Sequence, residues 1–353
     1  MNIHELTALA RQMKASDIHL SEGLPLMFRV DGRLMQPPVQ MSADETRSLI
    51  LGLMDEAHRE AILTERIDAD FALVAPDGPR SRVNVFFQQG RAAATLRLLN
   101  DAIPTLAELS MPPVLTKLAD EPRGLILVTG PTGSGKSTTL AAMIDHINET
   151  RRDHIITIED PIEYVHRHEG CIVTQREIPS DVATYAEALR SAMREAPDVI
   201  LLGEMRDQET IGTAMTAAEM AQLLFSTLHT TGASSTVDRI IDAFSANQQR
   251  QIRMQLSLVL QAVVSQQLVP TVDGDIVPVF EIMTATPAIR NLIREEKTHQ
   301  IDSVIASSAG AGMRTMDQSL HRLVKEGTIS KEVALQHAIH QEALKKRFET
   351  EGM

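Results

Sequence analysis

The sequence is poor in cysteine and in aromatic residues. Its 353 residues include one cysteine, Cys171, no tryptophan and two tyrosines, and aromatic residues make up 3% of the chain. A single cysteine excludes an internal disulfide and a zinc site built from four cysteines, and we expect Cys171 to be a buried structural residue. With so few rings to stack on unpaired bases, a single-stranded nucleic-acid binder is disfavoured.

Long hydrophobic runs and net positive charge are also absent. No segment approaches the roughly 18 consecutive apolar residues of a membrane-spanning helix, and the opening MNIHELTALARQMK has the pattern of an amphipathic helix, not that of a signal peptide. The formal net charge of −13 argues against general affinity for nucleic acid. We therefore expect a cytoplasmic globular protein with no membrane span and no nucleic-acid partner.

The first hundred residues have the pattern of a small α+β domain. The Asp31–Gly32 pair is expected to form a hairpin turn, and DETRSLILGLMDEAHREAILTE is spaced as a helix. Strand-like runs are SDIHL, LMFRV, RLM, ADFALVA, SRVNVFFQ and AAATLRLL. We predict this domain over residues 1–100, followed by a proline-rich linker over 101–113 with the joint near residue 112.

Strands and helices alternate after the linker. LILVTG, HIITIED, DVILLGEM and LLFSTL have the pattern of buried strands, and amphipathic segments lie between them. This alternation predicts an α/β fold, with a mostly parallel sheet covered by helices on both faces, over residues 114–353. After Ser234 the pattern is mostly helical, and NQQRQIRMQLSLVLQAVVSQQLV is the longest predicted helix.

The segment GPTGSGKSTTL, residues 130–140, has the spacing of a phosphate-binding loop between a strand and a helix. Such a loop points backbone N–H groups at phosphates, and the helix N-terminus adds partial positive charge. ATP is the expected ligand, with Lys136 on its β- and γ-phosphates and Ser137 as a ligand of Mg²⁺. The residues expected to bind nucleotide are Thr132, Gly133, Ser134, Gly135, Lys136, Ser137 and Thr138.

Two groups of carboxylates follow predicted strands. Glu159, Asp160 and Glu163 come at or just after the end of HIITIE, and Glu204 follows VILLG. Because ligands of doubly wound sheets bind at the carboxyl ends of the strands, we expect both groups beside the phosphate loop. Each carboxylate alone could instead be a solvated charge at a strand end. His229 follows the strand LLFSTL, where a lone histidine is more often structural.

Three longer stretches resemble the motifs of one known family. MREAPDVILLGEMRD resembles the signature of the secretion ATPases that power type II secretion and type IV pili, IEDPIEYVH resembles their Asp box, and STLHTTGASSTVDRIID resembles their His box. The similarity covers nearly the whole chain. It implies a homo-hexameric ring ATPase in which a PAS-like N-terminal domain and a RecA-like P-loop ATPase core move against each other as ATP is hydrolysed.

The resemblance also implies roles for individual residues. Glu163 is expected to act as general base or to orient water, and Glu204 to hold the Mg²⁺ shell, although the sequence leaves these two roles exchangeable. His229 is expected to sense the γ-phosphate. Arg82 and Arg97 match strand positions from which the family's N-terminal domain donates arginines to the phosphoryl group; ordinary sheet-surface arginines are the alternative.

Within the family, the sequence favours the motors that retract pili. Assembly motors usually carry a long N-terminal extension and a four-cysteine zinc element, whereas this chain begins with the PAS-like domain and has one cysteine. The segment AIRNLIREEKTHQI, residues 288–301, is similar to the sequence that marks the PilT-like retraction ATPases of twitching motility. As an amphipathic helix it is expected to bury Ile289, Leu292 and Ile293 and to turn outward Arg290, Arg294, Glu295 and Glu296.

The same resemblance implies an inner-membrane platform protein and other pilus motor ATPases as partners, at the cytoplasmic face of the inner membrane. The chain departs from the family at Ala221-Gln222, where Gly-His is usual, and at Ala196, where an Asp commonly stands. These departures leave a weakly hydrolysing accessory motor or a regulator as alternatives. A pilus assembly or type II secretion ATPase and a DNA-translocating ATPase are the others.

Overall fold

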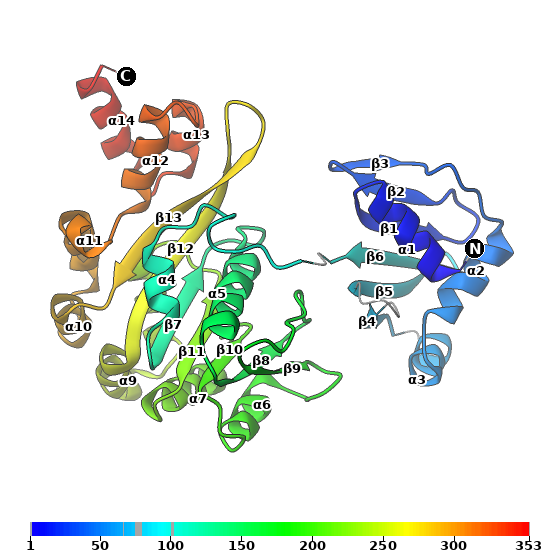
Figure 1. Ribbon diagram of the computed structural model, residues 1–353, viewed down its shortest axis with the longest axis horizontal. Helices are drawn as coiled ribbons and strands as arrows, with labels where there is room; N and C mark the ends of the chain where they lie inside the picture. The colour runs from blue at the N-terminus through cyan, green and yellow to red at the C-terminus, as the bar shows by residue number, and fades with distance from the viewer. Residues whose placement is uncertain (1, 66, 75–79, 100–101, 353) are drawn as a thin grey trace. The chain divides into compact units, whose positions relative to one another are not determined.

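The computed structural model describes residues 2–65, 67–74, 80–99 and 102–352 (Figure 1). The chain forms two compact units. The first comprises residues 1–102 and the short segment 163–165, and the second comprises 103–162 and 166–353. The prolines of the expected linker are thus counted with the second unit, and the domain bounds given above stay a prediction.

The first unit is an α+β fold. Its elements are α1 (Ile3–Gln12), β1 (Ala15–Ser21), β2 (Met27–Val30), β3 (Arg33–Met35), α2 (Ala43–Gly52), α3 (Glu56–Glu60), a π-helical turn (Ala61–Glu65), β4 (Ala69–Val74), β5 (Arg80–Gln88) and β6 (Arg91–Leu98). The six strands make one antiparallel sheet in the order β3-β2-β1-β6-β5-β4. Leu6 of α1 and Ile50 of α2 are fully buried in a core with Ile18 and Leu96 of the sheet.

Local signals explain two features of this unit. Asp31 and Gly32 have φ of 48° and 75°, the left-handed values that a two-residue turn needs, and they join β2 to β3 as predicted. The predicted helical run after Ser42 is split into α2 and α3. Asp55 causes this split, because its Oδ1 accepts a hydrogen bond of 2.8 Å from the backbone N–H of His58 and so begins a new helix.

The second unit is built on a sheet of seven strands in the order β13-β12-β7-β11-β10-β8-β9. These strands are β7 (Gly124–Thr129), β8 (His154–Glu159), β9 (Ile172–Glu177), β10 (Val199–Leu202), β11 (Leu223–Leu228), β12 (Leu260–Pro270) and β13 (Ile276–Thr284). All neighbours pair in parallel except β13, which is antiparallel to β12 at one edge. The prediction of a mostly parallel sheet is confirmed.

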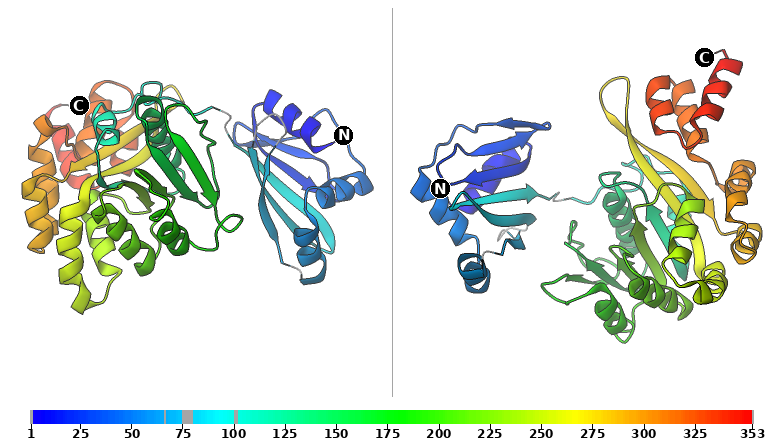
Figure 2. Two further views of the ribbon diagram at one scale, coloured as in Figure 1. Left: turned by 60° about the horizontal axis from the view of Figure 1, so that its bottom comes forward. Right: turned by 180° about the vertical axis from the view of Figure 1, so that it is seen from behind.

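Helices cover both faces of this sheet (Figures 1 and 2). They are α4 (Val114–Ala119), α5 (Lys136–Thr150), α6 (Tyr185–Ala192), α7 (Gln208–Glu219), α8 (Ala233–Asp242), α9 (Ala246–Val259), α10 (Pro287–Arg294), α11 (Ile301–Ser307), α12 (Met316–Lys325), α13 (Lys331–His337) and α14 (Gln341–Thr350). Successive strand residues point to opposite faces. Leu125 and Leu127 therefore share a core with α6 to α9, whereas Ile126 and Val128 share one with α4 and α5.

The longest predicted helix was wrong over its second half. The helix ends as α9 at Val259, and residues 260–270 form β12, the strand beside β7. Strands β9 and β13 were also not predicted. A central strand is apolar on both faces, so its pattern cannot be told from that of a buried helix. Proline is unfavourable inside a central strand, but Pro278 lies in β13, an edge strand, where proline is tolerated.

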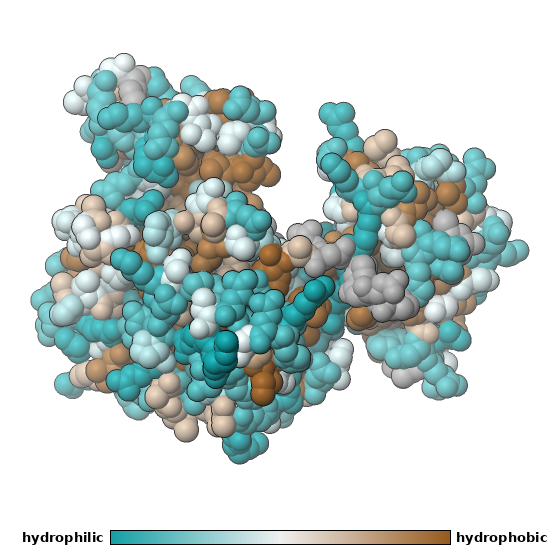
Figure 3. Space-filling view, viewed as in Figure 1, coloured by the Kyte–Doolittle hydropathy of each residue, from teal (hydrophilic) through white to brown (hydrophobic). Residues whose placement is uncertain are grey.

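The last helices pack on the outer end of the β12–β13 hairpin, drawn in yellow in Figure 1. Leu320 of α12 and Phe348 of α14 share a core there with Val269 and Val279. On the face drawn in Figure 3 most of the surface is hydrophilic. Within the part of the chain that the structure describes, no helix has the length and apolarity to cross a membrane. The single cysteine, Cys171, is buried as predicted.

Candidate nucleotide site

The phosphate-binding loop lies where motif and fold predict it, between the end of β7 and the start of α5. Gly130, Gly133 and Gly135 have φ of 140°, 79° and 84°. Residues other than glycine rarely adopt these backbone conformations. Lys136 is buried, and its Nζ donates hydrogen bonds to the carbonyl oxygens of Gly130, at 2.8 Å, and Pro131, at 3.0 Å. An ammonium held inside a glycine loop at a helix N-terminus fits a phosphate group.

The remaining loop residues differ in exposure. Thr132, Gly133 and Ser137 are exposed, and Ser137 lies on the first turn of α5, where a hydroxyl can reach a metal ion bound to phosphate. Thr138 is half-buried. Ser134 is buried, and its Oγ has no hydrogen-bond partner among the described residues. A buried hydroxyl without a partner suits a loop whose polar groups are completed by a ligand.

Three expected strand-end groups lie at the same edge of the sheet as this loop. Because β7, β11, β10 and β8 are parallel neighbours, their carboxyl ends present Gly130, His229, Glu204 and Asp160 along one edge. His229 Nε2 lies 3.2 Å from Glu204 Oε1. The structure thus brings together two residues from separate sequence motifs.

Glu204 has a second partner that the sequence reading missed. Its Oε2 accepts a hydrogen bond of 2.7 Å from Arg206 Nε, and Arg206 Nη1 lies 3.6 Å from Asp160 Oδ2. The hydrogen bond to Glu204 raises the pKa of Arg206. The arginine therefore links the carboxylates that follow β8 and β10. In the sequence, the position of Arg206 two residues after Glu204 was the signal that could have identified it.

Tyr185 was also missed. Arg206 lies over its ring, 5.9 Å from the ring centroid. Burial, with Asp160 adding to the effect, raises the pKa of the Tyr185 hydroxyl beyond its usual range, so this group stays protonated. A Cβ atom at Gly203 would lie 2.9 Å from the tyrosine oxygen. Glycine before Glu204 therefore leaves room for the ring that positions Arg206.

The other expected catalytic residues, Glu163, Arg82 and Arg97, are on other segments of the chain. Glu163 is exposed in the loop between β8 and β9, within the segment counted with the first unit. Arg82 and Arg97 lie directly opposite each other on β5 and β6. Arg82 pairs with Asp70 at 2.8 Å, and Arg97 pairs with Asp17 at 3.0 Å. The catalytic roles of these three residues stay predictions.

Each of the two opposed arginines lies beside a different carboxylate, which offsets the repulsion between like charges on neighbouring strands. Asp17 is buried, and although burial alone would raise its pKa, hydrogen bonds from Ser16 and Arg97 lower it below the usual value. Arg97 itself keeps 68% of its side chain exposed. The ion pair with Asp17 therefore holds Arg97 through its Nε, while most of the side chain stays exposed.

Comparison with known proteins decides the family. Residues 2–343 match the family described as Type II/IV secretion system protein. The chain belongs to the type II/IV secretion system protein family. It is 49% identical over 341 residues to the type IV pilus retractation ATPase PilT of Pseudomonas aeruginosa, covering 96% of this chain and 98% of that protein.

A second relative and a solved structure are also similar to the chain over most of its length. The twitching motility protein of Neisseria gonorrhoeae is 48% identical, over 90% of this chain and 85% of that protein. A crystal structure of the pilus retraction motor PilT with bound ADP matches with a TM-score of 0.92 at 44% identity, over 98% of this chain and 99% of that one. The resemblance and the α/β fold class predicted from sequence are confirmed, and this likeness supports nucleotide use by the present family member.

Helix α10 differs from one expectation stated above. Ile289 and Ile293 are fully buried, and Arg294, Glu295 and Glu296 are exposed, as predicted. Arg290 does not point outward. Its Nη1 donates hydrogen bonds to the carbonyl oxygens of Ser257, at 2.6 Å, and Leu258, at 2.9 Å, in the last turn of α9. A guanidinium at that place satisfies carbonyls that the helix end leaves unpaired.

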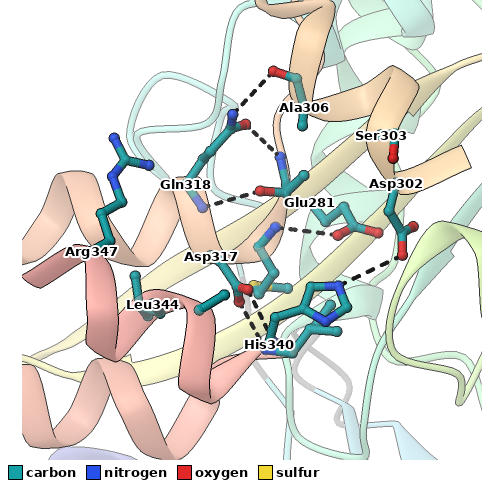
Figure 4. Close-up of a pocket in the computed structure, with 13 residues that line it drawn as sticks. Glu281, Asp302, Ser303, Ala306, Asp317, Gln318, His340, Leu344 and Arg347 are labelled. Atoms are coloured by element: carbon teal, nitrogen blue, oxygen red, sulfur yellow. Dashed lines mark hydrogen bonds and ion pairs between the residues drawn. The ribbon is translucent and has the colours of Figure 1, made fainter.

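A separate cavity of about 320 Å³ lies among the C-terminal helices (Figure 4). Glu281 of β13 is buried there, and it accepts backbone hydrogen bonds from Ala233, at 2.7 Å, and Met316, at 3.2 Å. Despite these bonds, burial raises the pKa of Glu281. His340 and Asp302 also line the cavity and lie 3.8 Å apart (Figure 4). Among the residues that the structure describes, no three or more histidine, cysteine, aspartate or glutamate side chains gather in a way that could hold a metal ion.

Proposed function

We propose that the chain is the subunit of a homo-hexameric motor that hydrolyses ATP to retract type IV pili. One observation carries this proposal: a phosphate-binding loop shares a sheet edge with the Glu204–His229 pair, in a chain that is similar over nearly its whole length to pilus retraction ATPases. The similarity of residues 288–301, which include most of α10, to the retraction ATPases also supports a function in retraction.

The loop residues give ATP a defined place. The backbone N–H groups of residues 133–138 and the start of α5 would hold the phosphates, and Lys136 would exchange its two loop carbonyls for phosphate oxygens. Ser137 and, partly through water, Glu204 would hold Mg²⁺. The ion, when bound, neutralises phosphate charge.

The remaining roles follow from charge and position. Glu163 or Glu204 would serve as general base or orient the attacking water. His229, 3.2 Å from Glu204, would orient that carboxylate and respond to the γ-phosphate. Arg82 and Arg97 would neutralise the transferred phosphoryl group. Outside the ring, the proposed partners are the inner-membrane pilus platform protein and other pilus motor ATPases, at the cytoplasmic face of the inner membrane.

Lys136→Ala tests the proposed site directly. The variant removes the positive charge that the phosphates need, so ATP turnover by the purified protein should be lost. The matched control is Lys325→Ala, an exposed lysine on α12, which should keep normal turnover. Unchanged turnover in Lys136→Ala would exclude this loop as the site of hydrolysis.

The direction of the motor is tested in cells. If the chain is a retraction motor, cells that lack its gene should lose twitching and carry excess surface pili, because fibres are still built but not withdrawn. If the chain is an assembly motor, the same cells should lose their pili; if it is a secretion motor, pili and twitching should be unchanged. A weakly hydrolysing accessory motor, the second candidate, is favoured by the Ala221-Gln222 departure and predicts low turnover with partial retention of twitching.

A further inference from the structure

The phosphate-binding loop has a close neighbour outside its own motif, Gln266 of β12. This side chain is 1% exposed, and its Oε1 accepts a hydrogen bond of 2.7 Å from Thr139 Oγ1. Thr139 is itself fully buried on the first turn of α5, directly after the loop. A buried amide on the adjacent strand therefore fixes the helix turn from which Lys136 and Ser137 project.

Gln266 also lies against both glycine ends of the loop. A Cβ atom at Gly130 would lie 2.1 Å from the main-chain oxygen of Gln266, and one at Gly135 would lie 2.8 Å from its Nε2. Gly133, in the middle of the loop, has nothing within 4 Å of the corresponding position. Gln266 thus approaches the two ends of the loop closely, whereas the centre of the loop is open.

This arrangement depends on the pairing of β12 with β7. Ser265 pairs with Thr129, the last residue of β7, so that Gln266 falls level with the first glycine of the loop. Because side chains alternate along a strand, the neighbouring Gln267 points elsewhere. Its Nε2 donates a hydrogen bond of 3.2 Å to the carbonyl oxygen of His337. Two adjacent glutamines therefore have separate surroundings, and one of them belongs to the loop.

We propose that Gln266 is a positioning residue for the nucleotide site, which sets the shape of the phosphate-binding loop through Thr139 and through its contacts at Gly130 and Gly135. The proposal rests on the proposed ATPase function. Gln266 need not touch the nucleotide. It keeps the loop ends at the separation that lets the central N–H groups converge on phosphate, which pre-organises the site before binding.

The test compares three single variants of the full-length protein. Gln266→Leu removes the amide, Thr139→Val removes the hydroxyl while keeping the side-chain shape, and Gln267→Leu is the matched control on the same strand. Affinity for ADP is measured by titration with a fluorescent ADP analogue, beside ATP turnover and the melting temperature without nucleotide. One lost buried hydrogen bond at the loop predicts about a ten-fold weaker affinity for Gln266→Leu and for Thr139→Val.

Several outcomes discriminate. The inference is supported if Gln266→Leu and Thr139→Val both weaken ADP binding, if the double variant is no worse than the stronger single one, and if Gln267→Leu lowers only the melting temperature. Normal ADP affinity and turnover in a folded Thr139→Val would overturn it, even if Gln266→Leu does not fold. Absence of turnover in the wild-type protein would count against the proposed function, whereas wild-type turnover with insensitive variants counts against Gln266 alone.

Discussion

At the scale of single residues, Glu204 contacts two other side chains of the candidate site, Arg206 and His229. Its side chain is 20% exposed, with one oxygen 2.7 Å from Arg206 and the other 3.2 Å from His229. Both carboxylate oxygens are thus engaged by groups of the chain itself. A metal ion would therefore bind Glu204 more readily through a bridging water molecule than directly, because direct binding would displace both partners.

Replacement of the site carboxylates is expected to separate chemistry from binding. Glu204→Gln and Glu163→Gln keep the side-chain shape but remove the charge that activates water or supports Mg²⁺, so kcat should fall on the order of 10²-fold or more. A fluorescent nucleotide should still bind both variants. Glu195→Gln, which removes a carboxylate paired with Arg176 at 3.1 Å, is the control. Full turnover in both site variants would remove the assigned chemistry.

Ala221 offers a prediction about stability. It has φ of 73° and is exposed, so its Cβ causes strain without contributing to packing. Strain of roughly 1–2 kcal/mol exceeds the added unfolded-state entropy of glycine. Ala221→Gly should therefore raise the free energy of unfolding by about 0.5–1 kcal/mol, measured by urea titration. Ala217→Gly, inside α7, should lower it by about 1 kcal/mol or more.

The sequence was sufficient to predict the place in the fold of residues that belong to contiguous motifs. The glycine loop, Glu204 and His229 could be named because each follows a recognisable strand, and parallel strands bring such residues to one edge. Tyr185 and Gln266 could not be found in this way. Each acts on the site from another element, through a contact at Gly203 or at Gly130, and no spacing along the chain records such a contact.

At the scale of elements, β12 shows what the sequence left undecided. Its eleven residues continue from α9 without a glycine or proline between them, so the helical pattern has no visible end. The strand forms because β7 and β13 pair with it on both sides. The pairing with β7 involves residues more than 100 positions away along the chain, and local propensity does not record such a contact.

The junction of α9 and β12 makes Arg290 a structural residue. Besides the two carbonyls of α9, its Nη2 donates a hydrogen bond of 3.0 Å to Gln261 Oε1. Arg290→Ala should therefore lower the free energy of unfolding by about 1–3 kcal/mol. Arg294→Ala, on the exposed face of the same helix, should stay within ~0.5 kcal/mol of the wild type. Urea unfolding of both variants measures this difference; equal stability would contradict the capping role.

The variants Arg290→Ala and Arg294→Ala also distinguish an effect on folding from an effect on motor output. If the exposed face of α10 transmits the stroke to a partner, Arg294→Ala should keep normal turnover and melting temperature and yet abolish twitching with excess surface pili. Arg290→Ala is unsuitable for this purpose, because its effects on folding and on output are mixed. Normal twitching with Arg294→Ala at normal expression would refute an output role for that charge.

At the scale of the whole molecule, the candidate groups are divided between the two units. The phosphate loop, Glu204 and His229 belong to the second unit, and Arg82 and Arg97 belong to the first. Neither unit alone contains both the loop and the arginines that the proposed chemistry uses. A ring in which each site takes its arginine from a neighbouring subunit would make hydrolysis depend on assembly, and this is testable without knowledge of the pilus.

Mixed rings test whether the arginine acts across a subunit boundary. Arg82→Ala or Arg97→Ala alone should reduce kcat, with ~10³-fold as the upper expectation for such a residue, and Lys136→Ala alone should be inactive. In rings that combine Arg82→Ala with Lys136→Ala subunits, an intact loop can meet an intact arginine only at a boundary between the two kinds of subunit. Turnover should therefore recover in mixed rings, purified through two different tags. If such rings form but remain as inactive as either parent, the arginine acts within its own subunit or not at all.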